Sequence, residues 1–254
     1  VIKFMRPQAC RTPVTQERGA FRVDKLANRQ QYGRVIQALH HLAAPARPDD
    51  SKKRVAMKPT QCILETILDS GEHAVRAAAS RSAAMRSATD SGDLNASQIR
   101  AMEAASCQSV VLIQGPPGTG KTSLAVRILR QWARTGGPGG GGILAASDSN
   151  IAVDNIVEGV GKLNVDVIRL GRPESARPEL LAHCADEIAC KLLGVTRLKE
   201  ADKRRAHDTV HECIKRARVC CTTAIGAGSG ILEKYGFQRV LIDEASQATE
   251  LATI

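Results

Sequence analysis

The chain has 254 residues, of which 36 are Lys or Arg, 26 are Asp or Glu, and six are aromatic (one Trp, two Tyr, three Phe). That length allows one large domain with a buried core, so disulfides or structural metals are not needed for folding. No apolar run is long enough to span a membrane, and six aromatic residues are too few for a base-stacking platform of the single-strand-binding type.

Positive charge is concentrated near the N-terminus. Residues 1–60 hold 13 basic and 4 acidic residues, so this segment carries 13 − 4 = +9 of the chain's net +10. A basic segment favours a polyanionic partner, most often nucleic acid, although a solvated flank is the alternative interpretation. The chain begins at Val1 rather than Met, and no sequence pattern at Ile254 marks the end of a domain. We therefore expect a piece of a longer protein.

The eight cysteines include no C-x-x-C pair, and reduced thiols of this kind are typical of a cytoplasmic or nuclear protein. A zinc site can be imagined from one group of His and Cys residues, but its spacings match no common zinc finger. We therefore expect scattered core and surface residues instead. The group comprises His183, Cys184, Cys190, His207, His211 and Cys213.

Three parts follow one another along the chain. In residues 1–60, apolar positions recur at helical intervals over 23–42, and a proline-containing basic linker follows at 43–59. Residues 61–93 predict an Ala-rich helical linker. Residues 94–254 form the main domain, in which short apolar runs alternate with helical patterns.

That alternation predicts an α/β fold, a parallel sheet flanked by helices. Helices are expected from Lys121 to Arg134 and over Ile151–Leu163, and a charged, mostly helical excursion over Glu179–Arg216. Gly136–Gly142 is a glycine-rich loop. The expected strands are Val110–Gln114, Ile143–Ala146, Val165–Leu170, Val219–Thr222 and Val240–Ile242.

A glycine-rich loop follows the first expected strand and matches G-x-x-x-x-G-K-[ST], the P-loop pattern. Glycines let backbone N–H groups turn inward around phosphates, and the helix behind the loop adds its positive dipole end. Lys121 supplies a charge to the β- and γ-phosphates of ATP, and Thr122 offers a hydroxyl to Mg²⁺. The loop comprises Gly115, Pro116, Pro117, Gly118, Thr119, Gly120, Lys121 and Thr122.

The second half of this site is expected at the end of the strand Val240–Ile242, where Asp243 and Glu244 follow an apolar run. Strand ends deliver carboxylates to one edge of a parallel sheet. We expect Asp243 to hold the Mg²⁺ ion and Glu244 to polarise the attacking water as a general base.

The segment Asp243-Glu244-Ala245-Ser246-Gln247-Ala248 resembles motif II of the superfamily 1 type B helicases, the group of the nonsense-mediated-decay (up-frameshift) helicase, the immunoglobulin-mu-binding helicase and senataxin. Leu94–Gln98 is similar to the group's Q motif, whose Gln reads adenine. The resemblance implies catalytic roles for Lys121, Glu244 and Gln247, and contacts from Asn95 and Gln98 to the nucleotide. It also implies a RecA-like P-loop fold.

Further segments resemble motifs of the same helicase group and follow one another in the same order. Ser149–Asn155 resembles motif Ia, whose Ser-Asn pair contacts the nucleic-acid backbone. Val219–Thr223 resembles a second segment that contacts the nucleic-acid strand in this group. Ile168–Arg172 matches the group's next strand, and Phe21–Asn28 looks like the tail of an accessory domain. The resemblance thus implies nucleic-acid contacts from Ser149, Asn150, Thr222 and Thr223.

The resemblance implies an ATP-dependent helicase or translocase that moves 5′→3′ on RNA or single-stranded DNA, with a second RecA-like domain in the parent chain. One departure is Asp148, which stands where the group usually has Pro and puts a negative charge beside a phosphate contact. Two alternatives stay open: another P-loop NTPase such as a kinase, and a nucleotide- or RNA-binding module without turnover. The segment Arg197–Arg218 is either a basic nucleic-acid helix or a solvated face of mixed charge.

Overall fold

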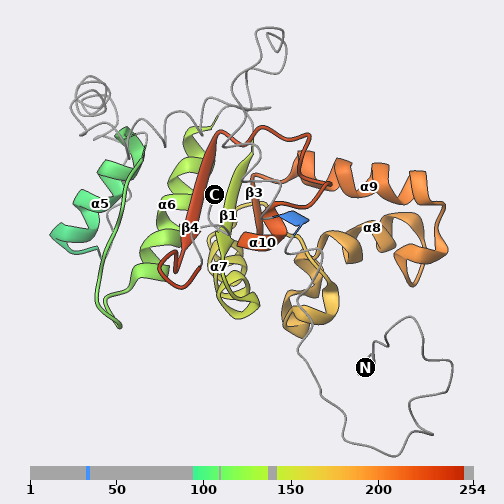
Figure 1. Ribbon diagram of the computed structural model, residues 1–254, viewed down its shortest axis with the longest axis horizontal. Coiled ribbons are helices and arrows are strands. Elements are labelled where there is room, and N and C mark those ends of the chain that lie inside the picture. The colour runs from blue at the N-terminus through green and yellow to red at the C-terminus, as the bar shows by residue number, and fades with distance from the viewer. Residues whose placement is uncertain (1–32, 35–93, 109, 137–141, 249–254) are drawn as a thin grey trace, which may run out of the picture.

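The computed structural model describes residues 33–34, 94–108, 110–136 and 142–248 (Figure 1). The expected accessory-domain remnant, the helix at 23–42 and both linkers therefore lie outside the described residues, apart from Gly33 and Arg34. Most of the Gly136–Gly142 loop also lies outside them.

The centre of the molecule is a four-stranded parallel sheet with the order β2-β3-β1-β4. Its register sets Ser147 level with Thr223 on one side and with Asp243 on the other, so the carboxyl ends of these three strands share one edge of the sheet. The strands are β1 (Ile143–Ser147), β2 (Val167–Arg169), β3 (Val219–Thr223) and β4 (Arg239–Asp243).

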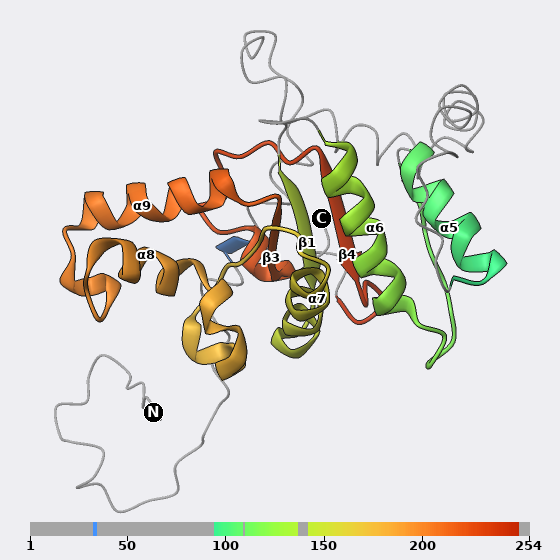
Figure 2. The same cartoon turned by 180° about the vertical axis from the view of Figure 1, so that it is seen from behind.

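Helices cover both faces of this sheet, and side-chain alternation along the strands explains how (Figures 1 and 2). Ile143, Ala145 and Val219 point toward α5, α6 and α7, whereas Leu144 and Cys220 point toward α8 and α9. The helices are α5 (Ala96–Cys107), α6 (Lys121–Thr135), α7 (Asn150–Lys162), α8 (Ala185–Leu193), α9 (Lys203–Arg216) and the short α10 (Ala224–Ala227), with 3-10 turns at Pro173–Ser175, Pro178–His183 and Leu198–Glu200.

The expected α/β architecture is confirmed, and so is the parallel sheet flanked by helices. The charged excursion between β2 and β3 folds into α8 and α9, which pack on each other and on one face of the sheet. The expected strand Val165–Leu170 is shorter than its apolar run, because only Val167–Arg169 pairs with β3.

The expected strand Val110–Gln114 is wrong for this structure. Residues 110–114 run between α5 and α6 without pairing to any strand of the sheet, and Leu112 is 94% exposed (Figure 1). An apolar run suits burial, but a strand exists only where a neighbouring backbone supplies hydrogen bonds. Within the described residues, β4 pairs with β1 alone, and Val240 on β4 is 51% exposed.

The six residues of the imagined zinc group are divided between the core and the surface. Among the described residues no group of three or more His, Cys, Asp or Glu side chains can hold a metal ion. Cys184, Cys190 and Cys213 are buried in the core, where burial raises the pKa of each thiol. His207 and His211 contact each other on α9, with their Nε2 atoms 3.1 Å apart. No helix in the described part of the chain is long and apolar enough to cross a membrane.

Candidate ATP site and nucleic-acid surface

The loop between residue 114 and α6 folds as a phosphate cradle. Gly118 and Gly120 have φ angles of +78° and +79°, a left-handed conformation that glycine adopts without strain. A Cβ atom built on Gly115 would lie 2.7 Å from Thr119 Oγ1, and one on Gly120 would lie 3.2 Å from Gln98 Nε2. A side chain at either position would therefore occupy space that the backbone N–H groups need in order to surround a phosphate.

Lys121 opens α6, and its side chain folds back over the loop. Its Nζ donates to the carbonyl oxygens of Gly115 (2.8 Å) and Pro116 (3.0 Å). The ammonium group is thus held above the loop at the N-terminal end of a 15-residue helix. Both the charge and the helix dipole favour an anion at this position.

Thr122 and Asp243 meet, although 121 positions separate them in the chain. The Thr122 hydroxyl donates to Asp243 Oδ2 at 3.1 Å, joining the first turn of α6 to the end of β4. Asp243 is buried, with 8% of its surface exposed. A hydroxyl and a carboxylate beside an anion cradle are the oxygen ligands that Mg²⁺ accepts, so these residues fit the metal that the sequence predicts.

Glu244 takes an unusual backbone conformation directly after this carboxylate. Its φ is +55°, and its backbone N–H donates to Asp243 Oδ1 at 3.1 Å. Left-handed backbone is rare for a residue with a side chain and is concentrated at functional sites. Gln247 lies on the turn that follows, is exposed, and donates from its backbone N–H to the Glu244 carbonyl at 2.9 Å.

Asn95 and Gln98 form a capping box at the start of α5. The Asn95 side chain accepts from the Gln98 N–H at 2.9 Å, and Gln98 Oε1 accepts from the Asn95 N–H at 3.0 Å. Gln98 Nε2 also donates to the Thr119 carbonyl at 3.1 Å. The capping box therefore brings Gln98 against the P-loop, next to the cradle.

The residues expected to contact nucleic acid lie at the same sheet edge, but not all present their side chains. Ser149 accepts from the Ala152 N–H at 3.1 Å and caps α7, and the neighbouring Asn150 is exposed. Thr223 caps α10 by accepting from the Gly226 N–H at 3.0 Å. Thr222 is only 2% exposed, because its position on β3 turns the side chain into the molecule.

A buried ion pair that the sequence motifs did not predict lies next to Asn150. Arg169, at the end of β2, is 1% exposed, and its Nε lies 2.6 Å from Asp154 Oδ1 on α7. Arginine and aspartate are almost never fully buried unless paired. The available signal was a charged residue, Arg169, at the end of an apolar run, together with an acid, Asp154, on the apolar face of the preceding helix.

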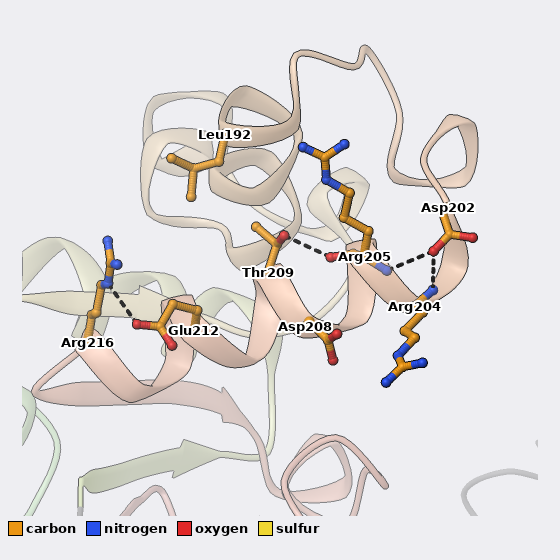
Figure 3. Close-up of a pocket in the computed structure, with 8 residues that line it drawn as sticks. All are labelled: Leu192, Asp202, Arg204, Arg205, Asp208, Thr209, Glu212 and Arg216. Atoms are coloured by element: carbon orange, nitrogen blue, oxygen red, sulfur yellow. Dashed lines mark hydrogen bonds and ion pairs between the residues drawn. The ribbon is translucent and has the colours of Figure 1, made fainter.

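A separate surface pocket of about 520 Å³ lies between α8 and α9, on the opposite face of the sheet from the P-loop helix (Figures 1 and 3). Its walls carry both charges, and several side chains are already engaged. Arg216 Nε pairs with Glu212 Oε1 at 3.1 Å, and Asp202 Oδ1 accepts from backbone N–H groups of α9. This supports the solvated mixed-charge face over a basic nucleic-acid helix.

The model of a family described as AAA domain matches residues 93–197 and 192–254, more than half of the chain. The chain belongs to this family. The resemblance to superfamily 1 type B helicases of the up-frameshift group is confirmed, and so is the RecA-like P-loop fold.

Three relatives illustrate the likeness, each matching 62% of this chain. A regulator of nonsense transcripts 1 homolog from Drosophila melanogaster is 33% identical over 177 residues. In Schizosaccharomyces pombe, a DNA polymerase alpha-associated DNA helicase A is 32% identical over 192 residues, and an ATP-dependent helicase upf1 is 30% identical over 183 residues. The match spans 15%, 28% and 19% of these relatives, respectively.

Proposed function

We propose that residues 94–254 are the ATP-binding, first RecA-like domain of a helicase or translocase that moves 5′→3′ on RNA or single-stranded DNA. The observation that carries the proposal is the Thr122–Asp243 hydrogen bond of 3.1 Å beside the Lys121 ammonium. This bond joins the start of the P-loop helix to the end of β4 at one edge of the sheet, which supports a Mg·ATP site there. The helicase names of the matched relatives support the coupling to a nucleic-acid strand.

The residues of the site have separable roles in this proposal. The P-loop backbone and Lys121 bind the β- and γ-phosphates, and Thr122 and Asp243 hold Mg²⁺. Gln98 and Asn95 would contact the nucleotide base, and the Gln98 bond to the Thr119 carbonyl of the P-loop supports this role. When bound, Mg·ATP supplies the phosphoanhydride bond whose hydrolysis drives movement.

Glu244 would orient the attacking water and accept its proton as the general base. In this proposal the Asp243 carboxylate serves the metal and the Glu244 carboxylate serves water, and the left-handed backbone at Glu244 supports a functional role for its side chain. The exposed Gln247 lies one turn further on, where it would meet either the γ-phosphate or the second domain of the parent chain.

Strand displacement tests the function itself. We expect the parent protein to separate a duplex with a 5′ single-stranded tail in the presence of Mg·ATP, and not one with a 3′ tail. The 254-residue chain alone should separate neither and hydrolyse ATP barely above background, because arginine fingers worth about 10³–10⁵ in turnover come from another domain. Robust strand displacement by the monomeric 254-residue chain would contradict the two-domain proposal, and equal activity on both tails would contradict the direction.

A further inference from the structure

The buried Arg169 joins three parts of the molecule that meet at the proposed nucleic-acid surface. Its Nε bonds Asp154 of α7 at 2.6 Å, and its Nη2 donates to Asn150 Oδ1 and to the Ser175 carbonyl, each at 3.1 Å. Asp154 is itself 2% exposed and accepts from the Arg177 backbone N–H at 2.9 Å through its other oxygen. The carboxylate is thus satisfied on both sides, and the guanidinium position is fixed.

This contact decides which way the Asn150 amide faces. A guanidinium group only donates hydrogen bonds, so the Asn150 oxygen must turn toward Arg169. The amide NH₂ group is then directed away from Arg169, at an exposed residue in the first turn of α7. An outward NH₂ group beside the positive end of a helix dipole suits an anionic oxygen.

We propose that Arg169 is a positioning residue for nucleic-acid binding: it fixes the Asn150 amide so that its NH₂ group faces a phosphate of the bound strand. This inference rests on the proposed function, because it takes Asn150 as a strand contact. Asp154 serves the same end by holding Arg169 in place. The ion pair is internally neutral, so it orients the donor without adding net charge to the surface.

Arg169→Lys tests the inference without leaving the buried Asp154 carboxylate unpaired. A lysine keeps the charge but lacks the planar guanidinium fork, in which Nε donates to Asp154 while Nη2 donates to Asn150. We expect wild-type secondary structure and ATP binding, but weaker binding of a homopolymeric single-stranded oligonucleotide by the 254-residue chain. The loss should be about tenfold, the usual worth of a hydrogen bond to a charged group.

Two further variants separate positioning from a merely structural role. Asn150→Ala should lower oligonucleotide affinity about as much as Arg169→Lys, and the double variant should bind no more weakly than Asn150→Ala alone. Arg177→Lys is the matched control: Arg177 belongs to the same network, with Nη2 2.8 Å from Glu158 Oε2, but does not touch Asn150. Its affinity should equal that of the wild type.

The salt dependence gives an independent readout. Because Arg169→Lys retains the charge, the slope of log affinity against log salt should stay at the wild-type value while the affinity falls.

The outcomes distinguish this inference from the function on which it rests. Additive effects of Arg169→Lys and Asn150→Ala, or wild-type affinity in Arg169→Lys, would overturn the positioning role while leaving a nucleic-acid-binding chain. Wild-type affinity in Asn150→Ala would overturn the strand contact and the positioning role together. A wild-type chain that binds no oligonucleotide would overturn the proposed function as well.

Discussion

Among the described residues of the proposed site, Glu244 is the one that has a side chain and a left-handed backbone conformation. Its φ of +55°, directly after Asp243, carries strain on the order of 1 kcal/mol, which the surrounding contacts must offset. The Asp243 Oδ1 bond to the Glu244 N–H, at 3.1 Å, is one of those contacts. Strain at this position indicates that the direction of the Glu244 carboxylate matters.

Glu244→Gln should therefore separate binding from chemistry. The amide preserves the size and the backbone bond but cannot accept a proton, so the parent protein should bind ATP nearly as before. Nucleic-acid-stimulated hydrolysis should slow by about 10²-fold or more, the usual worth of a positioned general base. The measurement is steady-state phosphate release at saturating ATP, and a rate equal to wild type would show that another group is the base.

At the residue scale, the sequence motifs predicted that Thr122 and Asp243 share a site, and the structure brings these two residues together, but the motifs did not predict the network behind them. Thr122 and Asp243 were predicted because a P-loop and an acid-tipped strand have only one way to share a site. Arg169 and Asp154 were missed as a pair, since a spacing of 15 residues between a strand and a helix has no local signature. The burial of Thr222 also depends on the strand's orientation, which the motif alone does not give.

At the scale of elements, α7 packs closely against α6, the helix that carries two residues of the proposed site. A Cβ atom built on Gly159 would lie 2.6 Å from Val126 Cγ2 and 3.2 Å from its Cγ1. Because a β-branched valine is stiff within a helix, rotating its side chain relieves neither contact. Gly159 thus lets α7 pack against the helix that carries Lys121 and Thr122.

Gly159→Ala should lower the free energy of unfolding by about 1–3 kcal/mol, the range for an overpacked core. Gly161→Ala, two residues along α7, is the matched control, because its added Cβ would meet only ordinary contacts, the nearest at 3.4 Å. There the helix propensity of alanine should leave stability unchanged or raised by up to about 1 kcal/mol. Urea denaturation of both variants checks this, and equal effects at the two positions would contradict the packing argument.

Most elements of the main domain followed from their patterns, because a buried strand or an amphipathic helix must repeat its apolar side chains at a fixed period. Helix α6 and strands β1, β3 and β4 were predicted to within one or two residues. The run Val110–Gln114 was not, since apolar composition specifies burial but not a hydrogen-bonding neighbour. The vicinal Cys220 and Cys221 are central strand residues, and burial raises the pKa of Cys220 to about 12.

For the whole molecule, the charge distribution indicates how a nucleic-acid strand would be bound. The +9 charge of residues 1–60 and the few aromatic residues favour phosphate contacts over base stacking. Oligonucleotide affinity should therefore tolerate sequence changes and fall steeply with salt, with a log–log slope near −0.7 for each phosphate neutralised on a single strand. Fluorescence anisotropy across a salt series measures this, and an affinity independent of salt would contradict it.

The central claim is that Lys121, Thr122 and Asp243 form one Mg·ATP site. Isothermal titration of ATP into the 254-residue chain, with and without Mg²⁺, tests it most directly. We predict that Lys121→Ala weakens binding about tenfold or more in both conditions, that Asp243→Asn weakens it only when Mg²⁺ is present, and that Lys162→Ala, an exposed lysine at the far end of α7, leaves it unchanged. Wild-type ATP affinity in Lys121→Ala, or the same loss in Asp243→Asn with and without Mg²⁺, would contradict the claim.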